Sequence, residues 1–240
     1  MGFLDIILFC IYVFFFSLFF AARRKRLKSP VEKYYHKLGF WVKILSTIAI
    51  TIFNLYISVG DSTILYYTEG LNLYHLMLED ASNVSLFLNP GKDFNLNLVG
   101  NPYNQGYFKG EANFFIIRLV AILSYVTFGR YLLLNLIFSM LAFTGIWKLF
   151  QFFYELYPHL HKRIALAVIF LPTVVFWSSG VLKDPICMGA LGWLTFGLYN
   201  LMIKKVSLVK NVLIALAGVW VLSIVKPYIL FAYLPFIMIF

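Results

Sequence analysis

Residues 3–26 read FLDIILFCIYVFFFSLFFAARRKR, an apolar run that ends in four consecutive basic residues. A helix needs about 20 largely apolar residues to cross the hydrocarbon core of a bilayer, and this run meets that length. A secretory signal peptide carries its basic residues before the apolar core, whereas this segment carries them after it. We therefore predict a retained transmembrane helix at residues 3–22, anchored by its basic residues at the cytoplasmic face.

The composition of the whole chain agrees with a membrane protein. Of its 240 residues, 62% are hydrophobic and 12% are charged, whereas an average soluble domain is about half apolar and a quarter charged. Twenty-six Phe and 16 Tyr residues exceed what a soluble fold of this size can bury, and two cysteines are too few for a disulfide-stapled secreted module. We predict an all-α fold, a polytopic transmembrane helical bundle.

The charges indicate how the bundle is oriented. Eight of the 20 basic residues lie between Arg23 and Lys43, and others gather at residues 162–163 and 204–210, each time between apolar segments. Residues 59–112 instead hold six acidic residues against two lysines. Because basic residues in short loops stay in the cytoplasm, we predict that 59–112 is a large external segment. We expect the basic runs to contact anionic membrane lipid and no nucleic acid.

Further apolar segments bring the expected total to about seven spans. They lie at residues 44–59, 131–153, 164–182, 186–203, 211–225 and 228–240. Residues 1–43 would then form an N-terminal helix and a basic cytoplasmic segment that lies in the interface from residue 29 to 43. Residues 44–240 would form the main transmembrane domain. Because the chain stops inside an apolar segment without a polar tail, we expect an N-terminal portion of a longer protein.

Residues 113–150 allow two topologies. The segment 113–128 is apolar but contains Arg118, and Gly129-Arg130 separates it from the next apolar run. Residue 112 is expected outside and Lys162 inside, so an odd number of crossings must connect them. The simplest solution makes 131–153 the span and 113–128 an interfacial helix. Two crossings would place basic and acidic loops on the same side. We also expect short interfacial helices within the external segment.

This topology brings five ionisable residues to the outer face from distant parts of the chain: Asp61, Glu69, Lys183, Asp184 and Lys226. Ionisable residues beside membrane spans often mark functional sites, although each of these could also be an ordinary loop charge at a helix end. The motifs of soluble enzymes, such as a Gly-rich phosphate loop or a zinc-binding His-Glu-x-x-His, do not occur. We predict no metal site and no cofactor; a divalent cation is possible but nothing indicates one.

Three strings carry a family resemblance. Residues 59–67, VGDSTILYY, resemble the first external loop of the GT-C superfamily, the multipass glycosyltransferases that use lipid-linked sugars and include protein mannosyltransferases and aminoarabinose transferases. Residues 170–184 and the string IVKPY at 224–228 are similar to segments of bacterial members. The resemblance covers most of 44–240. The chain departs from the family in its extra helix at 3–22, in a single acid where many relatives have adjacent acids, and in having about half the expected length.

The resemblance implies an inverting glycosyltransferase with a polyprenyl-phosphate sugar donor and an unidentified acceptor. An acidic residue in the first external loop is the family's catalytic base or part of its catalytic centre, which assigns the role of base to Asp61. Lys183 and Lys226 would neutralise the departing phosphate, and Asp184 would hold Lys183 or orient the acceptor. Glu69 is a further candidate for substrate binding. The expected location is a bacterial inner membrane, with the active face in the periplasm.

Three other functions remain open. A transporter or flippase of lipid-linked saccharide would use the same cations without a base. A non-catalytic subunit of a membrane complex would use the external segment to dock other membrane subunits. A polysaccharide polymerase or ligase is a third possibility, but such enzymes typically rely on external arginines, and Arg130 is the only arginine expected near that face.

Overall fold

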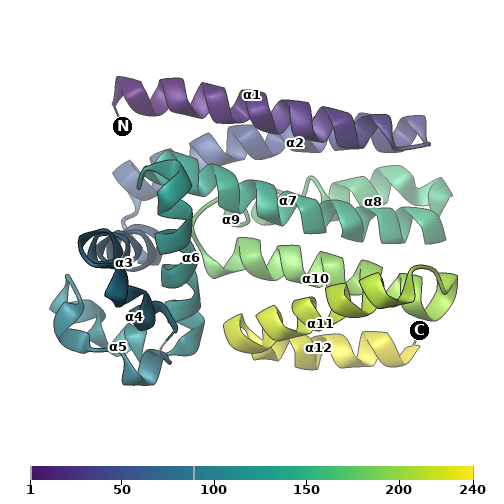
Figure 1. The fold of residues 1–240 in the computed structure, drawn as a ribbon. Coiled ribbons are helices and arrows are strands. Elements are labelled where there is room, and N and C mark those ends of the chain that lie inside the picture. The colour runs from purple at the N-terminus through teal and green to yellow at the C-terminus, as the bar shows by residue number, and fades with distance from the viewer. Residues whose placement is uncertain (1, 89, 240) are drawn as a thin grey trace.

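The structure is a computed structural model that describes residues 2–88 and 90–239. Every regular element in these residues is a helix, which confirms the all-α prediction. Five helices are long and apolar enough to cross a membrane, which supports an integral membrane protein. Figure 1 shows them side by side: α1 (Phe3–Lys25), α2 (Pro30–Ile52), α7 (Tyr131–Leu156), α10 (Lys183–Tyr199) and α11 (Leu208–Val225).

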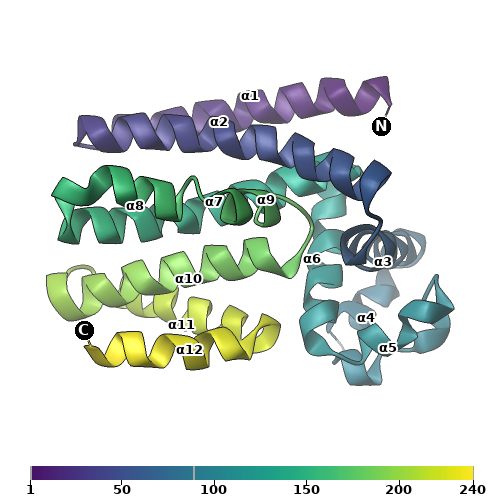
Figure 2. The ribbon, with the colours of Figure 1, turned by 180° about the vertical axis from the view of Figure 1, so that it is seen from behind.

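The bundle has two chemically different ends. At one end lie the connections that follow α1, α7 and α10, which carry the basic segments 23–28, 159–163 and 204–210 (Figures 1 and 2). We call this the basic end. The opposite end carries residues 58–128, and we call it the loop end. The chain therefore alternates between the two ends in the way that the charge distribution predicted.

The region before residue 44 differs from the prediction. We expected an interfacial segment at 29–43 and a separate span from residue 44. The structure instead has one continuous helix from Pro30, which a π-helical turn (Phe53–Ile57) extends to 28 residues. Ser29 caps its start by accepting a hydrogen bond from the Val31 backbone N–H, and proline is favoured at the first helical position.

Lys43 explains why this helix continues. Its charge suggested a membrane boundary, yet its side chain is only 2% exposed, in the middle of α2. The Nζ atom donates to the Ser178 carbonyl oxygen at 2.6 Å and to the hydroxyls of Ser178 and Ser179 at 2.9 and 2.7 Å. Protein oxygens replace water around the ammonium, so the charge does not force the helix to end.

The predicted span at 164–182 is broken. It consists of α8 (His161–Val168) and α9 (Pro172–Trp177), and neither is long enough to cross a membrane alone. Proline lacks a backbone N–H and ends a preceding helix, so Pro172 starts a new one. The last element, α12 (Pro227–Ile239), has 13 residues. Membrane crossing by these two regions stays a prediction.

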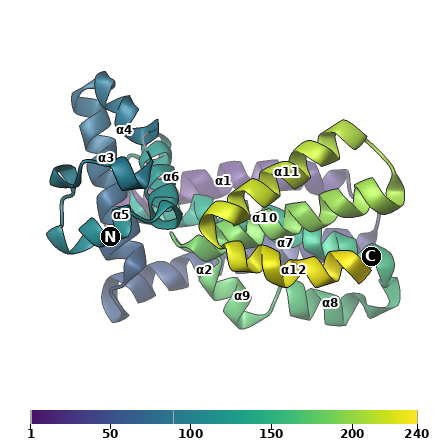
Figure 3. The same cartoon turned by 90° about the horizontal axis from the view of Figure 1, so that it is seen from below.

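The described residues at the loop end form a series of short helices and turns. The external segment includes a π-helical turn (Ser62–Tyr67), α3 (Thr68–Glu79), α4 (Val84–Leu88) and α5 (Gln105–Phe108), and α6 (Glu111–Thr127) begins at its end. Buried Phe94, Phe108 and Phe114 pack together between these pieces. Helix α6 runs across the direction of the long helices, and Figure 3 shows the whole group gathered at one end. That direction suits an interfacial helix, and its contact with lipid stays a prediction.

Helices α7 and α10 approach each other closely where three glycines meet. A Cβ atom added at Gly192 would lie 1.9 Å from the Gly145 carbonyl oxygen, and one added at Gly145 would lie 2.1 Å from that of Gly189. Small residues let helix backbones approach closely in membranes. This contact fixes α10, and therefore Lys183 and Asp184 at its start, against the central helix of the bundle.

Candidate functional site at the loop end

Two of the predicted residues form an ion pair. Lys226, which directly follows α11, places its Nζ 2.6 Å from the Asp184 Oδ1 in the first turn of α10. Partial burial opposes the charge of Lys226, but the hydrogen bond and charge of Asp184 outweigh it and raise the lysine pKa above its ordinary value. We expected Asp184 to hold Lys183; the structure pairs it with Lys226 instead, because α10 and α11 meet at this point.

Lys183 adds a second cation to this pair. It is the first residue of α10 and is half-buried, and it interacts electrostatically with Lys226, Asp61 and Asp184. Within the described residues, its ammonium makes no hydrogen bond or salt bridge. A lysine that is held next to another cation and has no carboxylate of its own attracts an anion. The partial positive charge at the N-terminus of α10 acts in the same direction.

Asp61 directly precedes the π-helical turn at Ser62–Tyr67 and interacts electrostatically with Lys183. The chain around it is fixed to the start of α7, because the Tyr131 hydroxyl is 2.6 Å from the Ser62 hydroxyl and accepts a hydrogen bond from the Asn54 amide at 3.1 Å. The Asp61 side chain itself is exposed. Its carboxylate has no hydrogen-bond donor in the part of the chain that the structure describes, so it is open to an incoming hydroxyl.

Tyr66 lies within the electrostatic reach of two of these carboxylates. Its ring is buried, and its hydroxyl donates to the Asn113 side-chain oxygen at 3.1 Å. Burial raises the pKa of this phenol well above its ordinary value, and the charges of Asp61 and Asp184 raise it further. Two acids that are separated by more than a hundred residues therefore act on one side chain. The loop end thus brings Asp61, Lys183, Asp184 and Lys226 together, and we call these four residues the loop-end cluster.

Glu69, the fifth predicted residue, has a different environment. It is 1% exposed and accepts four hydrogen bonds from the external segment. The donors are the side-chain amides of Asn72 and Asn104 and the backbone N–H groups of Gly100 and Asn101, at 2.7–3.1 Å. These contacts tie α3 to the loop before α5. We therefore assign Glu69 to the architecture of the segment and leave it out of the proposed substrate site.

Replacing Glu69 with Gln tests this assignment. The Gln amide group would face backbone donors with a donor of its own, which we expect to destabilise the loop by about 2 kcal/mol. Hydrogen exchange at the Gly100 and Asn101 amides should become faster. Glu79→Gln, on the exposed face of the same helix, serves as the control and should leave exchange unchanged. Equal protection in both variants would show that Glu69 does not hold the loop.

Two further residues, Tyr131 and Arg130, hold the loop end together through contacts that the sequence did not predict. Tyr131 holds the chain around Asp61, but a tyrosine at a helix start is common in membrane proteins. Arg130 forms a salt bridge with Asp5, which ties the start of α1 to the loop end. The one arginine that was expected near this face therefore already has an acidic partner. This weakens the polymerase or ligase alternative, which needs external arginines.

Neither a scan against protein-family models nor searches of curated proteins and solved structures found a match for this chain. The described residues contain no group of three or more His, Cys, Asp or Glu side chains that could hold a metal ion. The functional argument therefore rests on the geometry of the loop-end cluster.

Proposed function

We propose that the protein is a membrane glycosyltransferase that moves a sugar from a polyprenyl-phosphate donor to an acceptor hydroxyl at the loop end. The observation that carries this proposal is the juxtaposition of an open carboxylate, Asp61, with a cation that has no ion pair of its own among the described residues, Lys183. A base on one side and cations on the other are what transfer from a phosphate leaving group requires.

The proposed reaction is a single inverting displacement. The acceptor oxygen attacks the anomeric carbon while its proton passes to the Asp61 carboxylate. The bond between the anomeric carbon and the phosphate oxygen breaks, and its electron pair leaves with the polyprenyl phosphate. Negative charge on that phosphate increases during the step, so the nearby ammonium groups lower the barrier.

The four residues have distinct roles in this proposal. Lys183 binds the leaving phosphate directly, since its ammonium is available within the described structure. Asp184 is a positioning residue, because its hydrogen bond fixes the Lys226 ammonium at the same end. Lys226 then supplies a second, preorganised positive charge. Asp61 is the catalytic base. The donor and the surrounding lipid are the partners that this arrangement needs, and it requires neither nucleic acid nor metal.

The charge pattern supports the proposed orientation in the membrane. The basic end would lie in the cytoplasm under the positive-inside rule, which puts the loop-end cluster on the outer face. We place the protein in a bacterial inner membrane, with this cluster facing the periplasm. The external segment, with its short helices, lies next to the cluster and offers a surface for the acceptor or for other membrane subunits.

Donor binding to a Lys183→Gln variant tests the phosphate assignment. The purified chain, in liposomes, is titrated with polyprenyl-phosphate mannose and polyprenyl-phosphate aminoarabinose. Loss of one charge-assisted contact is expected to weaken donor affinity by about 10- to 100-fold. Lys109→Gln removes an exposed lysine from the same end and should have no effect. Undiminished affinity in Lys183→Gln would remove this lysine from the site.

A further inference from the structure

A cavity lined by several polar and basic side chains lies at the opposite end of the molecule from the loop-end cluster. It has a volume of about 410 Å³ and lies between α1, α2, α7, α10 and α11 at the basic end. Its lining includes four permanently or ordinarily cationic side chains, Arg23, Arg26, Lys148 and Lys210, and no acidic one. We call it the basic pocket.

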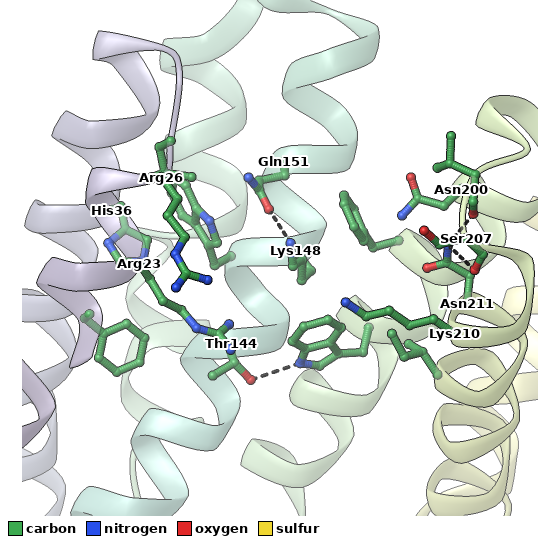
Figure 4. A pocket seen from close by; sticks show the side chains of 17 residues that line it. Arg23, Arg26, His36, Thr144, Lys148, Gln151, Asn200, Ser207, Lys210 and Asn211 are labelled. Carbon is green, nitrogen blue, oxygen red and sulfur yellow. Dashed lines mark hydrogen bonds between the residues drawn. The ribbon is translucent and has the colours of Figure 1, made fainter.

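The cations come from three helices and face a common space. Figure 4 shows Arg23 and Arg26 extending from the side of α1 and Lys210 from the side of α11, with Lys148 of α7 between them. Both Arg23 and Lys210 interact electrostatically with Lys148. Three like charges that converge without a lining carboxylate repel one another, and a bound anion relieves that repulsion.

The nearby acids do not neutralise the pocket. Glu155 pairs with Lys204, and Glu32 accepts a hydrogen bond from Gln151, whose oxygen in turn accepts one from Lys148 at 2.8 Å. Lys148 also lies over the rings of Phe196 and Trp193, at 4.1 and 5.4 Å from their centroids. These contacts hold the lysine in place and leave the two arginines and Lys210 facing the cavity.

An apolar groove continues from the basic pocket. It has a volume of about 490 Å³, and its lining shares Arg23, Thr144, Trp193, Lys210 and Ile214 with the pocket. From there it follows α10 up to Pro185 and α11 up to Val221. The twelve residues of α11 from Lys210 to Val221 span roughly 16 Å of helix, which matches the thickness of about 15 Å of one hydrocarbon leaflet.

We propose that the basic pocket and this groove form a binding site for an anionic phospholipid of the leaflet at the basic end. The phosphate would lie among Arg23, Arg26, Lys148 and Lys210, and one acyl chain would fill the groove between α10 and α11. Charge complementarity selects a phosphate headgroup, and the length of the groove selects a lipid over a free anion. The proposed phosphate subsite lies at the other end of the bundle from the loop-end cluster and uses none of its four residues, whereas the groove ends at Pro185, directly after Asp184.

The test uses the full chain in neutral detergent micelles and phosphatidylglycerol with brominated acyl chains as the probe. Trp193 lines both the pocket and the groove, so bound brominated chains should quench its fluorescence in a saturable way. Brominated phosphatidylcholine, which has no net charge, should bind at least about tenfold more weakly. Inorganic phosphate at the same concentration should not displace the lipid.

Two pairs of variants separate this site from general surface charge. Arg23→Gln with Lys210→Gln should weaken phosphatidylglycerol binding at least about tenfold. The matched pair, Lys25→Gln with Lys205→Gln, removes the same charge from exposed residues beside the same helices and should leave binding within about twofold. Ala217→Trp, which fills the groove, should weaken binding, whereas Leu216→Trp on the outer face of α11 should not.

Any of four results would overturn the proposal: no saturable quenching, equal affinity for the two lipids, equal losses in the two charge pairs, or displacement by inorganic phosphate. Equal losses would indicate attraction to the surface as a whole, and displacement would indicate a simple anion site. The groove variants keep the test decisive even if the charge variants fold poorly, because Ala217 and Leu216 are both exposed.

Discussion

Replacing Asp61 with Asn is expected to reduce sugar transfer by about 10²- to 10⁴-fold, the range that a general base contributes. Asn has the same shape but cannot take the proton from the acceptor hydroxyl. The carboxylate makes no hydrogen bond within the described residues, and the chain beside it is held by Ser62 and Tyr131, so the fold should not change. Donor affinity should stay within about twofold, because the lysines that bind the phosphate remain.

Asp93→Asn provides the control, since Asp93 is another exposed acid of the external segment. Transfer is measured in liposomes as release of polyprenyl phosphate from the radiolabelled donor. Wild-type turnover in the Asp61 variant would exclude this residue as the base. If the protein instead moved the intact donor between leaflets, with equal rates for the wild type and the Asp61 variant, the transporter alternative would replace the glycosyltransferase proposal.

Replacing Gly192 with Ala is expected to destabilise the bundle by about 3 kcal/mol or more, the upper part of the range for overpacking. Alanine normally favours a helix relative to glycine. Here its methyl group would lie 1.9 Å from the carbonyl oxygen of Gly145, a backbone atom that cannot move aside as a side chain can. The helices α7 and α10 must then separate. Stability is measured by thermal unfolding in detergent.

Gly106→Ala is the matched control, because a Cβ atom at Gly106 meets nothing within 4 Å and this residue also lies in a helix. It should be neutral or slightly stabilising. Equal stability of the Gly192 variant and the wild type would mean that α7 and α10 do not approach each other this closely. The position of Lys183 and Asp184 at the start of α10 would then also need revision.

The sequence predicted those features of the fold that depend on whether a residue prefers water or lipid. Apolar length and charge distribution indicate helices that alternate between a basic end and a loop end, and the described structure has this arrangement. It did not predict features that depend on a specific tertiary partner. Lys43 suggested a membrane boundary because a charge normally needs water, and only the fold supplies the oxygens of Ser178 and Ser179.

The candidate site likewise has features that the sequence predicted and features that it did not. That Asp61, Lys183, Asp184 and Lys226 share one end follows from counting spans. Span counting does not show which lysine pairs with Asp184. Lys183 and Asp184 are adjacent in sequence, but their side chains extend from the start of α10 in different directions, and Asp184 pairs with Lys226. Glu69 had the same sequence features as Asp61, an acid after the same span. Its burial depends on donors up to 35 residues away in the chain.

The most direct test of the site is a cross-link between Asp61→Cys and Lys183→Cys in intact membranes, with Cys10 and Cys187 first replaced by Ser and Ala. A short bis-maleimide should join the two positions, so that the fragments stay together after cleavage between them, and added polyprenyl-phosphate sugar should block the reaction. Asp93→Cys with Lys183→Cys should not cross-link. Failure of the first pair to cross-link would contradict the convergence of Asp61 and Lys183, on which the proposed function depends.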